Sequence, residues 1–240
     1  MKKIIVVAVC VGSLLLSACA YQSVSQNDQH YTDKKRLSLA QAHLLLGQWA
    51  LTKSQLDHIE TKGREYWRLL SLYWLSVGDE AKALAVHHQA LLLYPKDDFL
   101  LNNLGVILGQ KQQWSKACDV FQKASLIGLS SRQSVWINLS RCAIRQDDVK
   151  KAAKDLKRAK EVADLPLIGL MTELNLVLIQ GNLSRARLIL NNIQAETNNA
   201  RNTAYFDEYN CVSQQVIARE TDPTIYSSAS TSTCLDRSRY

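Results

Sequence analysis

The sequence is poor in the residues that interrupt helices, because its 240 residues include only 9 Gly and 3 Pro. An all-β sandwich or barrel needs a turn roughly every ten residues, so this scarcity argues against both. The net charge of +7 falls short of the basic excess typical of nucleic-acid-binding domains, and we expect no nucleic acid among the partners. Apolar residues, with Leu and Ala conspicuous, make up 47% of the chain, which is typical of a globular helical protein.

The sequence also lacks the motifs of common catalytic and cofactor sites. It contains no Gly-rich phosphate loop, no H-E-x-x-H, no G-x-S-x-G and no C-x-x-C pair. Its five histidines form no cluster with metal-ligand spacing. Glu80 and the pair Asp147-Asp148 stand at predicted helix starts, where carboxylates complement the helix dipole. We therefore expect no catalytic residue, no metal, no cofactor and no small-molecule substrate, and interpret the chain as a non-enzyme.

The longest apolar run lies at the N-terminus, where Lys2 and Lys3 precede the mostly apolar residues 4–16. That run is too short to span a bilayer as a single helix and is typical of a signal peptide. The following Leu16-Ser17-Ala18-Cys19 resembles the lipobox of bacterial lipoproteins. The resemblance implies removal of residues 1–18 and acylation of Cys19, and Ala20 after it implies the periplasmic face of the outer membrane. The alternative is an ordinary secretory signal cut after Ala18 or Ala20.

Polar, aperiodic residues 19–32 follow and are expected to form a flexible tether. Beyond them the chain repeats itself. Residues 64–97 align with residues 98–131 at a shift of 34, and further copies start at Gln133 and Leu167, with a degenerate one near Asp33. Bulky and small apolar residues recur at fixed places; the small ones include Ser71, Gly105, Ser140, Ala83, Ala117 and Ala152. His87 occupies a place where other copies have Phe121 and Leu156, so we interpret it as a packing residue.

This pattern resembles the tetratricopeptide repeat over residues 33–197, with about five copies. The resemblance implies an all-α fold in which pairs of antiparallel helices stack into a right-handed superhelix. A helix breaker or polar pair marks each turn within a repeat: Gly47, Gly78-Asp79, Gln112-Gln113, Asp147-Asp148 and Gly181-Asn182. We expect residues 198–219 to form a capping helix and the Ser/Thr-rich residues 220–240 to form a poorly ordered tail. The alternative is an unrelated helical bundle.

In tetratricopeptide proteins the first helices of the repeats line a groove that binds a segment of a partner protein. By that resemblance the predicted groove residues are Arg68, Leu72, Phe99, Asn102, Val106, Ile137, Arg141, Arg145, Met171 and Asn175. Several of them could instead pack against neighbouring helices. The second helix of the copy at Gln133 carries a basic cluster: Lys150, Lys151, Lys154, Lys157, Arg158 and Lys160. This cluster is either a solvated face or a contact for an acidic partner or anionic headgroups.

Four cysteines lie in the predicted folded part: Cys118, Cys142, Cys211 and Cys234. Four cysteines allow three pairings, and an oxidising periplasm permits disulfides. We favour the pairing of Cys118 with Cys142 and of Cys211 with Cys234; the alternative is that one or both pairs stay as buried thiols.

The middle repeats are similar to the type IV pilus biogenesis lipoproteins, the PilF/PilW pilotins. The similarity is carried by Asn102-Asn103-Leu104-Gly105, by residues 138–143 (NLSRCA), and by Ala186-Arg187 before Leu190. It implies that the partner is an outer-membrane secretin or another pilus-assembly protein. Gly109 stands where those proteins usually carry a cysteine, and Cys118 is then the candidate partner of Cys142. The alternatives are a lipoprotein resembling TadD of the tight-adherence (Flp) pilus and a periplasmic adaptor of another envelope machine.

Overall fold

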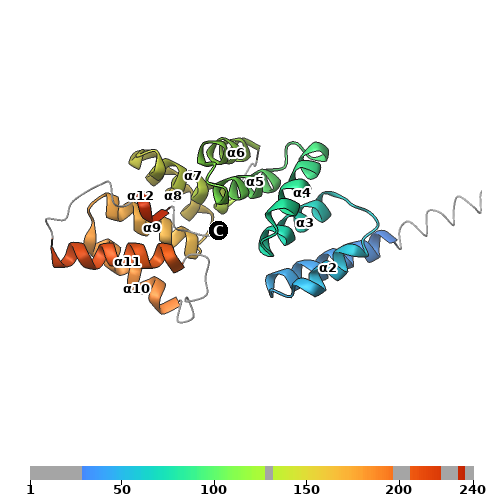
Figure 1. The fold of residues 1–240 in the computed structure, drawn as a ribbon, viewed down its shortest axis with the longest axis horizontal. Helices are drawn as coiled ribbons and strands as arrows, with labels where there is room; N and C mark the ends of the chain where they lie inside the picture. Colours follow the sequence, from blue (N-terminus) through green and yellow to red (C-terminus); the bar gives the residue numbers. More distant parts are fainter. Residues whose placement is uncertain (1–28, 128–131, 197–205, 223–231, 236–240) are drawn as a thin grey trace, which may run out of the picture. The chain divides into compact units, whose positions relative to one another are not determined.

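The computed structural model describes residues 29–127, 132–196, 206–222 and 232–235. Within these ranges every regular element is a helix (Figure 1). The N-terminal segment with Cys19 lies outside the described residues, as do parts of the expected tether and tail. Among the described residues no helix combines the length and the apolar character required to cross a bilayer. The all-α fold expected from the repeat pattern is therefore confirmed.

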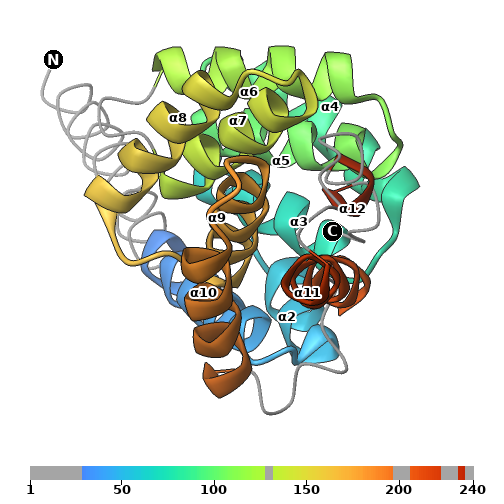
Figure 2. The same ribbon diagram turned by 90° about the vertical axis from the view of Figure 1, so that its left-hand side faces the viewer.

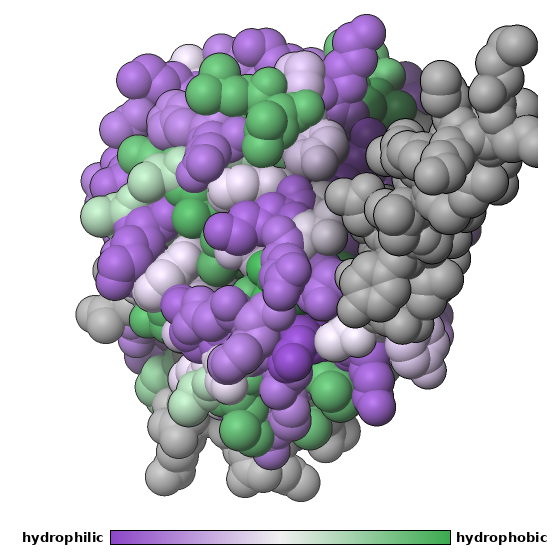
Figure 3. All heavy atoms as spheres, turned by 90° about the vertical axis from the view of Figure 1, so that its right-hand side faces the viewer, coloured by the Kyte–Doolittle hydropathy of each residue, from purple (hydrophilic) through white to green (hydrophobic). Residues whose placement is uncertain are grey.

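The chain forms two compact units, Met1–Ala90 and Leu91–Tyr240. In the first unit a helix over residues 29–45 is followed by α2 (Trp49–Asp57), α3 (Arg64–Ser76) and most of α4 (Glu80–Leu93). Asp33 joins the first helix to the loop before α3, because its carboxylate accepts hydrogen bonds from the backbone of Glu60 at 3.3 Å and Thr61 at 2.8 Å. Figure 3 shows a face of this unit, on which apolar side chains lie in separate groups among polar ones.

The second unit contains three helical hairpins and two further helices. The hairpins are α5 (Asp98–Gln110) with α6 (Trp114–Ile127), α7 (Gln133–Arg145) with α8 (Val149–Val162), and α9 (Leu167–Ile179) with α10 (Leu183–Glu196). They are followed by α11 (Phe206–Thr221) and the short α12 (Ser232–Leu235). Each hairpin in turn packs on the next, α6 on α7 and α8 on α9, as expected for stacked repeats.

The turn inside each helical hairpin passes through the left-handed region of backbone conformation. Three of these positions are glycines, with φ of +67° at Gly47, +76° at Gly78 and +74° at Gly181. The other two are Gln112 at +58° and Asp147 at +56°. Only glycine adopts this conformation without a steric cost, so the two non-glycine turns are held by the helices on either side. All five turns coincide with the breaker positions expected from the sequence.

Small residues let the paired helices approach closely. Ala83, Ala117, Ala152 and Ala186 occupy the same place in successive repeats, and each is fully buried. At Gly105 an added Cβ would lie 2.4 Å from the Phe121 ring, so no larger side chain fits there without a shift of α6. His87, in the place of Phe121 one repeat earlier, is fully buried, and its Nδ1 lies 2.7 Å from the Ala83 carbonyl oxygen. It is a packing residue, as predicted.

Specific contacts join the first two hairpins of the second unit. The disulfide Cys118–Cys142 links α6 to α7 with a Cα–Cα distance of 5.8 Å. Arg132 Nε donates to Asp98 Oδ2 at 2.9 Å, across one repeat length, and Asn138 Nδ2 donates to Asn102 Oδ1 at 3.0 Å. The repeat interface is therefore fixed by covalent, ionic and amide contacts as well as by its apolar core.

Candidate functional site

The face formed by α5, α7 and α9, here called the inner face, contains most of the residues predicted to bind a partner. Its helices lie in sequence order, since α7 packs against α9 and is bonded to α5 through Asn102 and Asn138. The chain's own C-terminal helices cover much of this face. Helix α11 packs against α9 and α10 and crosses them (Figures 1 and 2), and α12 packs against α7.

A buried ion pair anchors α11 to the inner face. Glu208 in the first turn of α11 accepts hydrogen bonds from Arg141 Nη1 at 3.1 Å and Nη2 at 2.8 Å. The side chains of Arg141 and Glu208 are 1% and 0% exposed. Asn175 Nδ2 donates to the same carboxylate at 3.0 Å, and Thr172 Oγ1 lies 3.5 Å from Arg141 Nη1. A bidentate ion pair of this kind fixes the orientation of the two side chains relative to each other, because the guanidinium and the carboxylate are both planar.

Two further arginines bond to backbone carbonyls across the same interface. Arg219 near the end of α11 donates to the Leu178 carbonyl at 2.8 Å. Arg145 donates to the Leu235 carbonyl at 2.7 Å, while its guanidinium lies 3.5 Å from the centre of the Trp114 ring. Both contacts place a charged donor on a carbonyl in the last turn of a helix, where the backbone acceptors are not all used within the helix.

The disulfide Cys211–Cys234 ties α12 to α11 with a Cα–Cα distance of 5.6 Å. Cys234 and Leu235 are both fully buried, although they lie in a stretch expected to be a poorly ordered tail. Both favoured cysteine pairings are thus present in the structure. The bridge brings part of the C-terminal segment back onto the folded repeats.

A second acidic residue, Glu173 on α9, forms ion pairs with basic residues of the neighbouring helices α8 and α10. Glu173 lies 2.8 Å from Lys160 Nζ and 3.0 Å from Arg185 Nη2. Burial acts to raise the pKa of Glu173, but the hydrogen bonds from Lys160 and Arg185 outweigh it, and the pKa is lowered. This cluster links α8, α9 and α10 and stabilises the hairpin stack.

The predicted groove residues fall into two groups. Arg141, Ile137, Met171 and Asn175 are buried, and Arg141 and Asn175 contact α11. Asn102 is also buried, through its bond to Asn138. The remaining predicted residues are partly exposed: Arg68 and Leu72 on α3, Phe99 and Val106 on α5, and Arg145 on α7. On the inner face, the predicted residues that stay partly exposed are therefore Phe99 and Val106 of α5 and Arg145 of α7.

Sequence reasoning missed Glu208 and Arg219. Both lie on the buried stripe of α11, at spacings of four, four and three residues with Val212 and Val216. The signal that could have identified them is a charged residue on the apolar stripe of an amphipathic helix, because such a charge needs a buried partner.

The described part of the chain shows no cluster of side chains suited to bind a metal ion. No group of three or more His, Cys, Asp or Glu side chains there is arranged to hold a metal ion.

Comparison with solved structures places the fold among tetratricopeptide-repeat proteins. PilF of Pseudomonas aeruginosa is similar with a TM-score of 0.60 and 14% identity, over 86% of this chain and 90% of that one. PilW, a type IV pilus biogenesis factor, is similar with a TM-score of 0.59 and 15% identity, over 83% and 97%. A thermophilic tetratricopeptide-repeat protein of Thermus thermophilus gives 0.57 and 14%, over 81% and 100%.

Similarity in sequence to known proteins covers less of the chain than similarity in structure. No model of a known protein family matches the chain. The general transcriptional corepressor trfA of Dictyostelium discoideum is 35% identical over 86 residues, which are 36% of this chain and 6% of the corepressor. The match spans a small part of that protein.

Proposed function

We propose that the chain is an outer-membrane lipoprotein that acts as a protein-interaction scaffold in pilus assembly, where it promotes the assembly or localisation of a secretin. The observation that carries the proposal is the agreement in fold and extent with PilF and PilW, two proteins connected by name with pili. The matches cover 90% and 97% of the lengths of these two proteins.

The N-terminal segment supports the membrane part of the proposal. Leu16-Ser17-Ala18-Cys19 supplies a lipobox, and several acyl chains on Cys19 would anchor the protein stably. Residues 20–28 leave a polar stretch between the anchor and the first described helix. The repeats would then lie in the periplasm close to the membrane that contains the secretin.

The residues that resemble the pilotins have structural roles in this chain. Asn138 and Asn102 bond to each other, Gly105 lies under Phe121, and Cys142 forms a disulfide. Their resemblance to the pilotins therefore concerns the packing of the repeats and identifies no contact with a partner. The partner contacts themselves must come from residues that remain exposed.

The test compares Cys19→Ala with Cys10→Ala in the organism that encodes the chain. Cys10 lies in the same apolar segment but outside the lipobox, so it controls for the loss of a thiol. We expect Cys19→Ala to leave the outer membrane and to lower the amount of secretin multimer, and Cys10→Ala to do neither.

A pull-down of the acylated chain from outer membranes identifies the partner. Recovery of a pilus secretin supports the proposal, and its identity distinguishes a type IV pilus from a tight-adherence pilus. Normal secretin multimers in the Cys19→Ala strain, with peptidoglycan enzymes recovered instead, would overturn it.

A further inference from the structure

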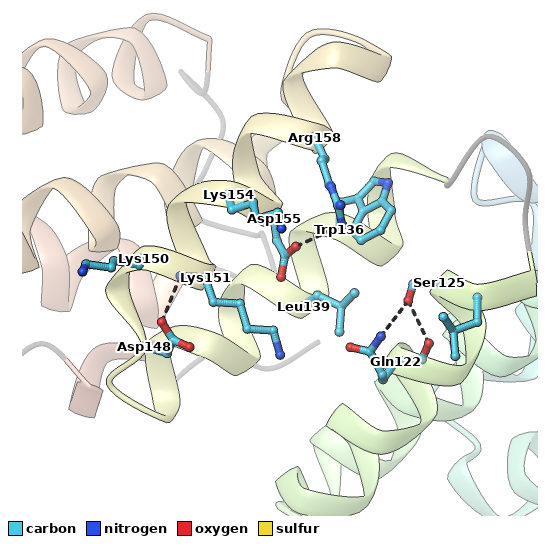
Figure 4. Close-up of a pocket in the computed structure, with 11 residues that line it drawn as sticks. Gln122, Ser125, Trp136, Leu139, Asp148, Lys150, Lys151, Lys154, Asp155 and Arg158 are labelled. Atoms are coloured by element: carbon cyan, nitrogen blue, oxygen red, sulfur yellow. Dashed lines mark hydrogen bonds and ion pairs between the residues drawn. The ribbon is translucent and has the colours of Figure 1, made fainter.

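Residues of α6, α7 and α8 and of the turn before α8 line an open cavity of about 650 Å³ (Figure 4). This volume is in the range of sites that hold a small ligand or a short peptide. Its lining includes most of the basic cluster of α8, namely Lys150, Lys151, Lys154 and Arg158. Leu126 and Leu139 add apolar surface, so the cavity is not a purely charged face.

A buried carboxylate with an unused oxygen lines the cavity. Asp155 is 4% exposed, and its Oδ2 has no hydrogen-bond partner within the described residues. Its Oδ1 lies 3.7 Å from Arg158 Nη1, which is an ion pair longer than a hydrogen bond. Burial raises the pKa of Asp155, against the attraction of Lys151, Arg158 and Lys154. This oxygen is an acceptor that a molecule bound in the cavity could use.

The other charges of the cavity favour an anionic ligand. Asp148 is already used as a helix cap, because its Oδ1 accepts from the backbone N–H of Lys151. The Arg158 guanidinium is positioned by the Trp136 ring, whose centre is 4.5 Å away. Lys151 and Lys154 lie at the rim. The lining therefore carries an excess of positive charge around one acceptor.

The spacing of the cations fits an extended peptide. Lys154 and Arg158 are one helical step of four residues apart, which is about 6 Å along the axis. Alternate residues of an extended chain are about 6.6 Å apart and point to the same side. Two carboxylates at alternate positions would face Lys154 and Arg158, and a backbone N–H would be free to reach Asp155.

We propose that this cavity binds a short, extended, acidic segment of a partner protein, with carboxylates at alternate positions. The inference rests on the proposed scaffold function and names the chemistry of one of its partners. An ionised phosphate group has no N–H to donate to the Asp155 oxygen and no apolar surface to place against Leu126 and Leu139. An acidic peptide offers backbone N–H donors and apolar side chains in addition to negative charge.

The test measures the affinity of the full chain, purified in detergent, for a fluorescein-labelled peptide of sequence Ser-Glu-Leu-Glu-Ser with blocked ends. Lys154→Glu is expected to weaken binding roughly fivefold to tenfold, since it replaces an attraction by a repulsion. Lys157→Glu makes the same charge change on the same helix, at an exposed position outside the lining. It is expected to change the affinity by less than about twofold.

Asp155→Leu tests the acceptor separately. Removing an unpartnered buried oxygen should leave the thermal midpoint unchanged or raised, while the peptide affinity falls. An unchanged affinity would remove Asp155 from the site. A peptide with Gln in place of both Glu residues should not bind.

Three results would overturn the proposal. Equal losses of peptide affinity in Lys154→Glu and Lys157→Glu would mean that the peptide is attracted by the net charge of the helix and not by the cavity. Equal binding of the Gln peptide would mean that carboxylates are not recognised. Binding of phosphatidylglycerol vesicles that Lys154→Glu abolishes, without binding of the peptide, would assign the cavity to a membrane surface. Peptide binding together with normal secretin assembly in the Cys19→Ala strain would instead reject the pilus function and keep the cavity.

Discussion

Replacing Glu208 by Gln removes the negative charge that faces Arg141 and keeps the size of the side chain. Both residues of the pair are almost completely buried, at 1% and 0% exposure, so water cannot take the place of the missing charge. Leaving one member of such a pair alone in the interior costs about 3–5 kcal/mol. Gln retains one acceptor for Arg141 or Asn175, so we expect the lower part of that range. For a chain of this size, a loss of about 3 kcal/mol corresponds to a decrease in Tm of about 6–12 °C.

The assay combines thermal unfolding, followed by circular dichroism, with hydrogen exchange of the native protein. Exchange should increase first in α11 and in the part of α7 around Arg141, because these segments meet at the pair. Glu220→Gln is the matched control on the same helix. Glu220 pairs with Arg187, but both side chains are more than a third exposed, at 36% and 37%. Solvent screens that pair, so we expect little change in Tm.

A Glu208→Gln protein with the wild-type Tm and unchanged exchange in α11 would refute the reasoning. It would mean that α11 is not held by this pair in solution. A loss of equal size in Glu220→Gln would show that net charge, rather than burial, determines the effect.

Three other perturbations test the repeat packing. Gly105→Ala places a Cβ against the Phe121 ring and should destabilise the second unit by about 1–3 kcal/mol in urea unfolding; an unchanged midpoint would contradict the close approach. Replacing Cys118 and Cys142 together by Ser should cost about 3 kcal/mol under non-reducing conditions, and no difference should remain after reduction of the parent protein. Burial lowers the pKa of His87 below its usual 6.5, so the unfolded chain takes up this proton first and stability is lost as the pH falls below 6.5. His87→Phe should remove that part of the pH dependence, and identical stability profiles from pH 7 to 5 would show that His87 is not buried as a neutral side chain.

The repeat architecture could be predicted because local rules and packing agree within each copy. The places of Gly78 and Gly181 predict turns within the repeats, and the structure has a turn with positive φ at both. Large residues such as Phe121 and small residues such as Gly105 recur at fixed places in the repeats, and this pattern predicts which helices approach closely. In the structure the Phe121 ring fills the space next to Gly105. Each of these signals lies within one or two repeats of its partner.

The covering of the inner face could not be predicted from periodicity. A helical pattern shows that Val212 and Val216 share one apolar side, but it does not show which surface that side meets. Arg141 has the position of a groove residue, and in the structure it faces Glu208, 67 residues further along the chain. Choosing between an external partner and an internal one needs the path of the chain after α10.

The contacts of α11 and α12 change how the second unit should fold. Most repeat proteins behave as one-dimensional arrays in which each unit touches only its neighbours, and the ends can open first. Here Arg141 bonds to a residue 67 positions away and Arg145 to one 90 positions away. The C-terminal residues thereby close a loop over two hairpins. We expect α5 to α12 to unfold in a single cooperative step, with no separate opening of the last repeat.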